Sequence, residues 1–287
     1  MYRSLIISIS ITLAGTAAAA TKANLWSTTS NLEKPESVYF DAESNKIFVS
    51  NIAGGGGDKD SNGWIATITF DKQGKPVVTK LLDGLNAPKG IRVQNGFLWV
   101  TDIDEVLKVN VATGKLIERI SIAGAQFLND LAIGANGDVY VSDMLASKIY
   151  VIENGKPEIF AEGDVLTSPN GLLVQNGRLI VAAWGLITDV ATRGVKVPGH
   201  LYSIDLTTKA QTQITKQPLG NLDGLEMTTA GDYIVSDWVA GKVYRVSKDG
   251  IPTLITDGIK NAADIGLKGD TLLIPAMSAN EVSAVKL

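Results

Sequence analysis

The sequence contains no cysteine and only one histidine, His200. Disulfide bonds are therefore excluded, and an exported protein of this composition must be stabilised by core packing, to which a bound metal could add. Zinc and copper sites, which are built from cysteine and histidine, are a poor fit. No run of lysine and arginine stands out and the formal net charge is −4, so nucleic acid is not an expected partner.

Long hydrophobic runs are also scarce, and the one near the N-terminus is short. Arg3 precedes an apolar segment, Leu5–Leu13, and Ala18–Ala20 provides small residues for cleavage. This order is typical of a signal peptide, which predicts removal of residues 1–20 and a mature chain of residues 21–287. An uncleaved membrane anchor is the alternative, but the apolar segment is too short to span a bilayer comfortably. We expect a periplasmic or secreted protein with no membrane partner after cleavage.

What the sequence does contain is a repeated unit of four short strand-like segments. One copy runs from Asn129 to Phe160, with β-branched and aromatic residues in each segment and Gly, Asn or Asp between them. Four such strands form one blade of a β-propeller. Copies of the unit start at Glu36, Lys89, Asn129, Asn170, Asp223 and Ala263. The repeat predicts an all-β fold, a six-bladed β-propeller.

The last unit is one strand short. The segment Asn24–Thr28, at the start of the mature chain, is strand-like and belongs to no other unit. We expect it to complete the sixth blade and close the ring, since closure leaves no open sheet edge.

Two of the units are longer than the others. Subtraction of the six start positions gives spacings of 53, 40, 41, 53 and 40 residues, so the first and fourth units carry extra residues. These fall between the second and third segments, at 53–62 and 185–199. Because strands alternate in direction within a blade, both loops should overhang the pore mouth where the inner strands begin. Long loops beside a site often act as lids.

The first residue of each inner strand is expected to point toward the central axis. Four of these residues carry oxygen donors, namely two carboxylates and two amides: Glu36, Asn129, Asn170 and Asp223. Hard oxygen ligands in flexible geometry suit Ca²⁺, with another divalent metal also possible. Without a cation the two carboxylates would face each other in a poorly solvated pore. Asn or Asp before Gly is also a common turn residue, which is the alternative for each position taken alone.

The motifs around these residues resemble the SMP-30/gluconolactonase family, which is related to the paraoxonases. They are Pro35–Phe40 (PESVYF), Leu128–Asp130 (LND), Ser168–Leu172 (SPNGL) and Leu222–Leu225 (LDGL). The resemblance covers essentially the whole mature chain. It implies a six-bladed propeller that hydrolyses lactones or organophosphates, with a pore calcium on Glu36, Asn129, Asn170 and Asp223.

The sequence departs from the family pattern in two places. Lys89 occupies the second blade start, where a cation would disfavour calcium unless the ammonium turns away or holds an anionic substrate. The sixth blade offers Ala263 and Asp264, and the pore histidines of paraoxonase-type enzymes are missing. Lys89 and His200 are therefore candidate substrate contacts, His200 being alternatively a half-exposed residue at a strand end.

The second strands end in Ser-Asp or a similar pair, which we interpret as caps for neighbouring loop amides. Apolar residues follow these pairs and either wall a substrate pocket or pack between blades. Trp184 and Trp238 are the preferred pocket residues.

A second acidic cluster lies in the first long loop. Asp58, Asp60 and Asn62, followed by Gly63, match the opening of an EF-hand loop. Position twelve is Thr69 and lacks the bidentate carboxylate. The cluster is therefore either a weak second metal site or a flexible acidic turn.

These observations predict a calcium-dependent hydrolase of a lactone or related ester. Asp223 or Glu36 would activate water or attack the carbonyl directly, and a small molecule would be the substrate. The alternative is a non-enzymatic periplasmic ligand-binding or scaffold propeller in which calcium has a structural role, because this fold hosts both.

Overall fold

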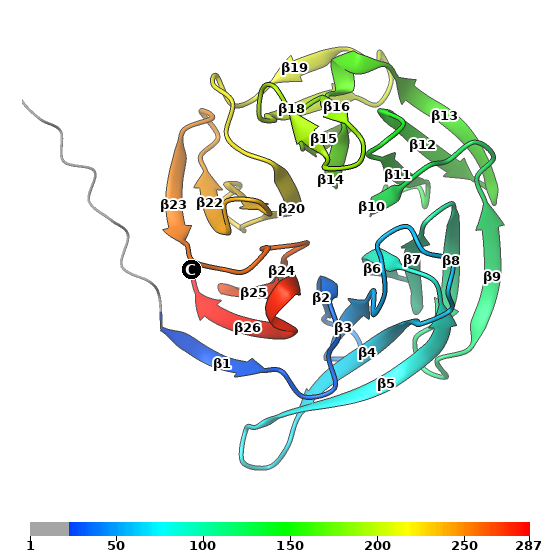
Figure 1. The fold of residues 1–287 in the computed structure, drawn as a ribbon, viewed down its shortest axis with the longest axis vertical. Coiled ribbons are helices and arrows are strands. Elements are labelled where there is room, and N and C mark those ends of the chain that lie inside the picture. Colours follow the sequence, from blue (N-terminus) through cyan, green and yellow to red (C-terminus); the bar gives the residue numbers. More distant parts are fainter. Residues whose placement is uncertain (1–22) are drawn as a thin grey trace, which may run out of the picture.

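The computed structural model describes residues 23–287, and its regular structure is almost entirely β. Six four-stranded antiparallel sheets stand around a central axis as the blades of a propeller (Figure 1). The predicted all-β, six-bladed architecture is confirmed. The predicted signal peptide, residues 1–20, lies outside the described residues. Within the described part, no helix is both long and apolar enough to cross a bilayer.

Each blade runs from an inner strand near the axis to an outer strand at the rim. The first blade consists of β2 (Pro35–Asp41), β3 (Lys46–Asn51), β4 (Gly63–Phe70) and β5 (Pro76–Leu85). The second consists of β6 (Pro88–Gln94), β7 (Phe97–Asp102), β8 (Glu105–Asn110) and β9 (Leu116–Ser121). The third consists of β10 (Leu128–Ile133), β11 (Val139–Asp143), β12 (Lys148–Glu153) and β13 (Lys156–Glu162). The fourth blade consists of β14 (Pro169–Gln175), β15 (Arg178–Ala183), β18 (Leu201–Asp205) and β19 (Gln211–Gln213). The fifth consists of β20 (Leu222–Met227), β21 (Tyr233–Asp237), β22 (Lys242–Val246) and β23 (Pro252–Thr256). Short 3-10 turns occur at η1 (Asp164–Leu166) and η2 (Met277–Ala279).

The sixth sheet combines strands from the two ends of the described chain. It contains β24 (Gly266–Lys268), β25 (Thr271–Ala276), β26 (Glu281–Lys286) and β1 (Asn24–Thr28). Strand β1 pairs antiparallel with β26, so the segment that the sequence left unassigned is the outer strand of this sheet. The first and last blades also meet near the axis, where the amide of Asp264 donates to the carbonyl of Glu36 at 2.8 Å.

The hydrophobic core lies between blades. One cluster joins Tyr140 and Ile149 of the third blade to Leu172 and Tyr202 of the fourth. Both faces of a blade are thus covered by its neighbours, and apolar residues occur on both faces of the strands. A single blade cannot bury its own faces, so each blade depends on its neighbours for stability.

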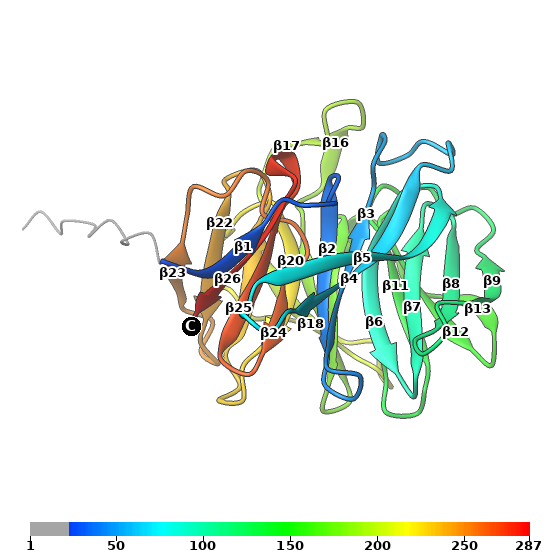
Figure 2. The ribbon, with the colours of Figure 1, turned by 90° about the horizontal axis from the view of Figure 1, so that it is seen from below.

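The two long loops project from one face of the ring, as the alternating strand directions predict. Figure 2 shows the hairpin β16 (Ile187–Asp189) and β17 (Gly194–Val195) beside the loop between β3 and β4. Their tips meet, because a Cβ placed on Gly56 would lie 3.4 Å from Nη2 of Arg193. The loops therefore overhang the pore from opposite blades.

Candidate functional site

The predicted pore residues lie where the inner strands depart from regular pairing. In each of the first five blades the register between the first and second strands shifts at the start of the inner strand. The residues within or at these shifts are Glu36, Lys89, Asn129, Asn170 and Asp223. A β-bulge turns a side chain out of the normal alternation of a strand. The bulges allow these residues to face the axis instead of packing between blades.

Side chains on the second strands fix the loops that lead into the bulges. Asp143 accepts hydrogen bonds from the amides of Gln126 (2.7 Å) and Phe127 (3.0 Å), just before Asn129. Asp102 does the same in the second blade. The interpretation of these residues as caps is confirmed. Their function is to hold the backbone that presents the pore residues.

Serine hydroxyls secure the bulged strands themselves. The Ser142 hydroxyl accepts a hydrogen bond from the amide of Asp130 at 2.9 Å. Ser50 and Ser236 accept equivalent hydrogen bonds from the amides of Ser37 (2.9 Å) and Gly224 (2.8 Å). All three serines are fully buried. The bulge amides would otherwise be unpaired, at a cost of about 1–3 kcal/mol each.

Glycine after two of the pore residues lets the inner strands approach closely. A Cβ on Gly171 would lie 2.1 Å from the carbonyl oxygen of Asp223, and one on Gly224 would lie 2.3 Å from the amide of Ile265. The Asn-Gly and Asp-Gly pairs are therefore packing requirements here. The close approach places Asn170 beside Asp223, and Asn170 opposes the rise in the pKa of the Asp223 carboxyl.

Four of the predicted pore residues line one small, deep cavity of about 60 Å³: Glu36, Lys89, Asn129 and Asp223. Asn170 is fully buried beside Asp223. Three oxygens of this group have no hydrogen-bond partner among the described residues, namely Oε2 of Glu36, Oδ1 of Asn129 and Oδ1 of Asn170. The Asn170 amide nitrogen donates to the carbonyl of Leu222 at 3.2 Å, which leaves its oxygen as the unpaired atom.

The donor set fits a hard cation. Unpaired buried oxygens are costly, and a cation would satisfy several of them at once. Within residues 23–287 no three His, Cys, Asp or Glu side chains gather into a metal site, so any cation here must also draw on amide oxygens. Carboxylate and amide oxygens are typical ligands of Ca²⁺. The metal role of these residues stays a prediction.

Burial and like charge perturb the two carboxyl groups. The pKa of Glu36 is raised well above its usual range, first by burial and then by Asp223 and Asp264. The pKa of Asp223 is raised by burial, then by Asp264 and Asp130. Both groups therefore favour the protonated form unless positive charge is added to the cavity.

These raised pKa values predict that protein kept in chelator loses stability as pH rises. The unfolded chain has carboxyl pKa values near 4, so between about pH 4 and the raised values the folded state binds more protons. The stabilising contribution is complete below about pH 4 and is lost as pH rises through the folded pKa values. Thermal denaturation in chelator should show Tm falling from about pH 5 to about pH 8, and Glu36→Gln should flatten the decline. A Tm that rises over this range contradicts the prediction.

Lys89 is buried in the same cavity. Its Nζ donates to the carbonyl of Ala87 at 2.9 Å and lies 4.3 Å from the centre of the Phe127 ring. Burial lowers the pKa of Lys89 to about 8, while Glu36 opposes the shift. Its ammonium thus has partners other than the pore oxygens.

Sequence reasoning missed a buried ionic network in the pore. Arg92 on β6 lies 3.2 Å from Asp130 and 3.2 Å from Asp264, and all three side chains are nearly inaccessible to water. Ser37 donates to Asp264 at 2.5 Å, and Arg92 also faces Glu226, whose pKa burial raises to about 7. A charged residue inside an apolar inner strand was the available signal, because such a charge must be paired.

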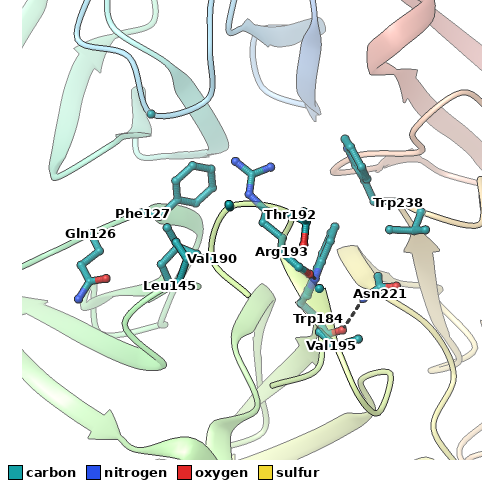
Figure 3. Close-up of a pocket in the computed structure, with 14 residues that line it drawn as sticks. Gln126, Phe127, Leu145, Trp184, Val190, Thr192, Arg193, Val195, Asn221 and Trp238 are labelled. Carbon is teal, nitrogen blue, oxygen red and sulfur yellow. Dashed lines mark hydrogen bonds between the residues drawn. The ribbon is translucent and has the colours of Figure 1, made fainter. Parts of the chain in front are cut away.

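A larger cavity of about 750 Å³ opens at the face that carries the long loops. It shares four wall residues with the small cavity, namely Phe127, Trp184, Arg193 and Trp238 (Figure 3). The two tryptophans were predicted as pocket residues, and the structure places both in these walls. Arg193 was not predicted. A ligand entering from the mouth passes between these side chains before it reaches the pore oxygens.

His200 lies elsewhere. It is half-buried, and its Nδ1 lies 3.0 Å from Nε2 of Gln213 on the outer strand β19. It is not among the residues that line either cavity, and it takes no part in the function proposed below.

The acidic cluster of the first long loop is exposed. Asp58 accepts the amide of Gly55 at 3.2 Å, and Asp60 accepts both the backbone amide (3.0 Å) and the side-chain amide (2.9 Å) of Asn62. These bonds stay within the loop and fit the acidic-turn interpretation.

Neither a protein family model nor a curated protein sequence matches this chain. Solved structures do match. A catalytically inactive virginiamycin B lyase from Staphylococcus aureus, with quinupristin, has 16% identity and a TM-score of 0.61, covering 93% of this chain and 98% of that one. A gluconolactonase from Xanthomonas campestris has 16% identity and a TM-score of 0.66, covering 93% and 87%.

A chain of a nidogen/laminin complex is also similar, with 13% identity and a TM-score of 0.66 over 79% of this chain and 87% of that one. At these identities the likeness shows the propeller fold alone. Membership of the SMP-30/gluconolactonase family therefore stays a prediction.

Proposed function

We propose that this chain hydrolyses a lactone or related ester and that it binds Ca²⁺ through Glu36, Asn129, Asn170 and Asp223. The observation that carries the proposal is the set of unpartnered, buried oxygens on the first three residues, beside the Asp223 carboxyl. They lie deep in the pore, where a wide mouth cavity leads to them. Two of the similar solved structures are named as enzymes, a gluconolactonase and a lyase, which is consistent with an enzymatic propeller.

The residues divide the work in this proposal. When bound, Ca²⁺ supplies positive charge that polarises the ester carbonyl and stabilises the charge developing on its oxygen. Glu36 and Asp223 contribute two negative charges, and the asparagines contribute neutral oxygens that hold the geometry. The bulges described above set the backbone at all four residues before any ligand arrives. Such preorganisation makes electrostatic stabilisation effective.

Proton transfer falls to a carboxylate. Asp223 or Glu36 takes a proton from water while the water oxygen bonds to the carbonyl carbon. The bond between that carbon and the ring or alkoxy oxygen then breaks, and the proton passes to the departing oxygen. Atoms and charge balance with water as the only co-reactant.

A panel of lactones and aryl esters tests the proposal. Turnover in calcium buffer should fall at least about tenfold in chelator and return when calcium is restored. Calorimetry on the same samples should report calcium uptake. Calcium uptake without turnover of any substrate would favour the non-enzymatic ligand-binding propeller, and absence of calcium uptake would overturn the site itself.

A further inference from the structure

Arg193 lies at the neck between the two cavities, where Asp223 and Glu36 attract it without forming a close ion pair. Its guanidinium carbon lies 4.6 Å from the centre of the Phe127 ring, and it lines both cavities (Figure 3). Among the ion pairs of residues 23–287, none involves Arg193. Lys89 faces the same ring at 4.3 Å. Two cations thus converge on one aromatic side chain at the entrance to the pore.

The loop of the fourth blade holds Arg193 in this position at some cost. Its φ is 54°, in the left-handed region that side chains rarely adopt. The indole Nε1 of Trp184 donates to the carbonyl of Arg193 at 3.1 Å, and Asp189 accepts a hydrogen bond from the Thr192 hydroxyl at 2.8 Å. A strained backbone that is fixed on both sides in this way is typical of a functional position.

The charges around the neck favour an anionic ligand. Among the residues that line the small cavity, Glu36 and Asp223 are balanced by Lys89 and Arg193, so a bound divalent cation would add two positive charges to this lining. A guanidinium binds a carboxylate through paired, charge-assisted hydrogen bonds. A bound carboxylate would give the Arg193 guanidinium a full ionic partner in place of its stacking contact with Phe127.

The walls of the large cavity are suited to a flat apolar group. They include Phe127, Leu145, Trp184, Val190, Val195 and Trp238. The two tryptophan rings lie 5.8 Å apart at an angle of 51°, which leaves their faces tilted toward one another. Aromatic and other planar apolar groups pack well on such surfaces.

From these observations we infer the substrate class. The site takes an ester or lactone that carries a carboxylate and an aromatic or similarly flat apolar group. Arg193 binds the carboxylate at the neck, and Trp184 and Trp238 hold the apolar group. The inference rests on the proposed function for its reactive ester, and it disfavours neutral sugar lactones.

Binding of two matched probes tests this class without any turnover. The probes are the anion of 1-naphthaleneacetic acid (the acetate probe), which has a free carboxylate, and 1-naphthaleneacetamide (the amide probe), its neutral isostere. Calorimetry on the calcium-loaded full chain should show the acetate binding at least about tenfold more tightly than the amide. Arg193→Gln should remove most of this difference and leave amide binding unchanged, and Arg193→Lys should keep part of it. Lys196→Gln, an exposed charge change in the same loop, is the control and should alter neither affinity.

Several outcomes would overturn the inference: equal binding of acetate and amide, no binding of the acetate at millimolar concentration, or an equal loss for both probes in Arg193→Gln. The hydrolysis panel separates this from the proposed function. Calcium-dependent turnover of neutral lactones, unaffected by Arg193→Gln, would keep the hydrolase and reject the substrate class. Acetate binding that depends on Arg193, in a protein with no esterase activity, would keep the anion site and reject the hydrolase.

Discussion

Asp223→Asn should sharply reduce calcium-dependent hydrolysis and yet make the chelated protein more stable. The substitution keeps the shape of the side chain and removes one of the two carboxylates of the proposed calcium site. Calcium affinity should fall by about a hundredfold or more, because ligand charge sets affinity at oxygen sites. Hydrolysis should fall by about 10²–10³-fold with the loss of a carboxylate that binds the cation or moves the proton.

The expected gain in stability comes from removing a buried negative charge in the absence of calcium. Asp223 raises the pKa of Glu36 in the buried pore, so removing the Asp223 charge relieves Glu36. We expect the free energy of unfolding in chelator to rise by about 1–3 kcal/mol at neutral pH. Urea denaturation with and without calcium measures both effects. Asp249→Asn makes the same charge change in an exposed turn of the fifth blade and should leave stability and activity near the wild-type values.

A protein with Asp223→Asn that is destabilised in chelator would show that this carboxylate is ionised and well paired without a metal. Retained calcium binding would exclude Asp223 as a ligand. Either result contradicts the proposed site, and the two can be separated because stability and calcium uptake are measured independently.

The ring and its pore residues could be predicted because the signals repeat. Each unit places strand segments between turn residues, and each begins with a residue that the ring directs to the axis. Glu36 was informative because a carboxylate that opens an apolar strand needs a partner outside its own blade. The β-bulges could not be predicted, since nothing in the amino-acid sequence distinguishes an inner strand that starts with a bulge from one that starts regularly.

Contacts between distant blades were beyond the reach of sequence reasoning. Arg92 of the second blade and Asp264 at the sixth blade are 172 residues apart and meet only because the ring brings their blades to the central axis. Arg193 looked like an ordinary loop residue, and its role depends on the meeting of two loops from opposite blades. His200 is the reverse case. A lone histidine drew interest by its chemistry, but its ring contacts Gln213 on an outer strand.

Arg92→Met should be the most destabilising single change in the pore. Arg92 is the cation between Asp130 and Asp264, each 3.2 Å from its guanidinium, and it also donates to the carbonyl of Ile91 at 2.8 Å. Methionine fills a similar volume but leaves two buried carboxylates without a counter-charge. Removing one partner of a buried ionic group costs about 3–5 kcal/mol. Urea denaturation of the wild-type and Arg92→Met proteins gives the difference in the free energy of unfolding.

The control is Arg119→Met, which removes an arginine from a surface pair with Glu105 and should cost less than about 1 kcal/mol. Adding Asp264→Asn to Arg92→Met should recover part of the loss, because the second change removes one of the stranded charges. A loss in Arg92→Met no larger than in Arg119→Met would mean that Asp130 and Asp264 are protonated in the native protein. The pore would then carry fewer negative charges, and burial alone would raise the pKa of Asp223.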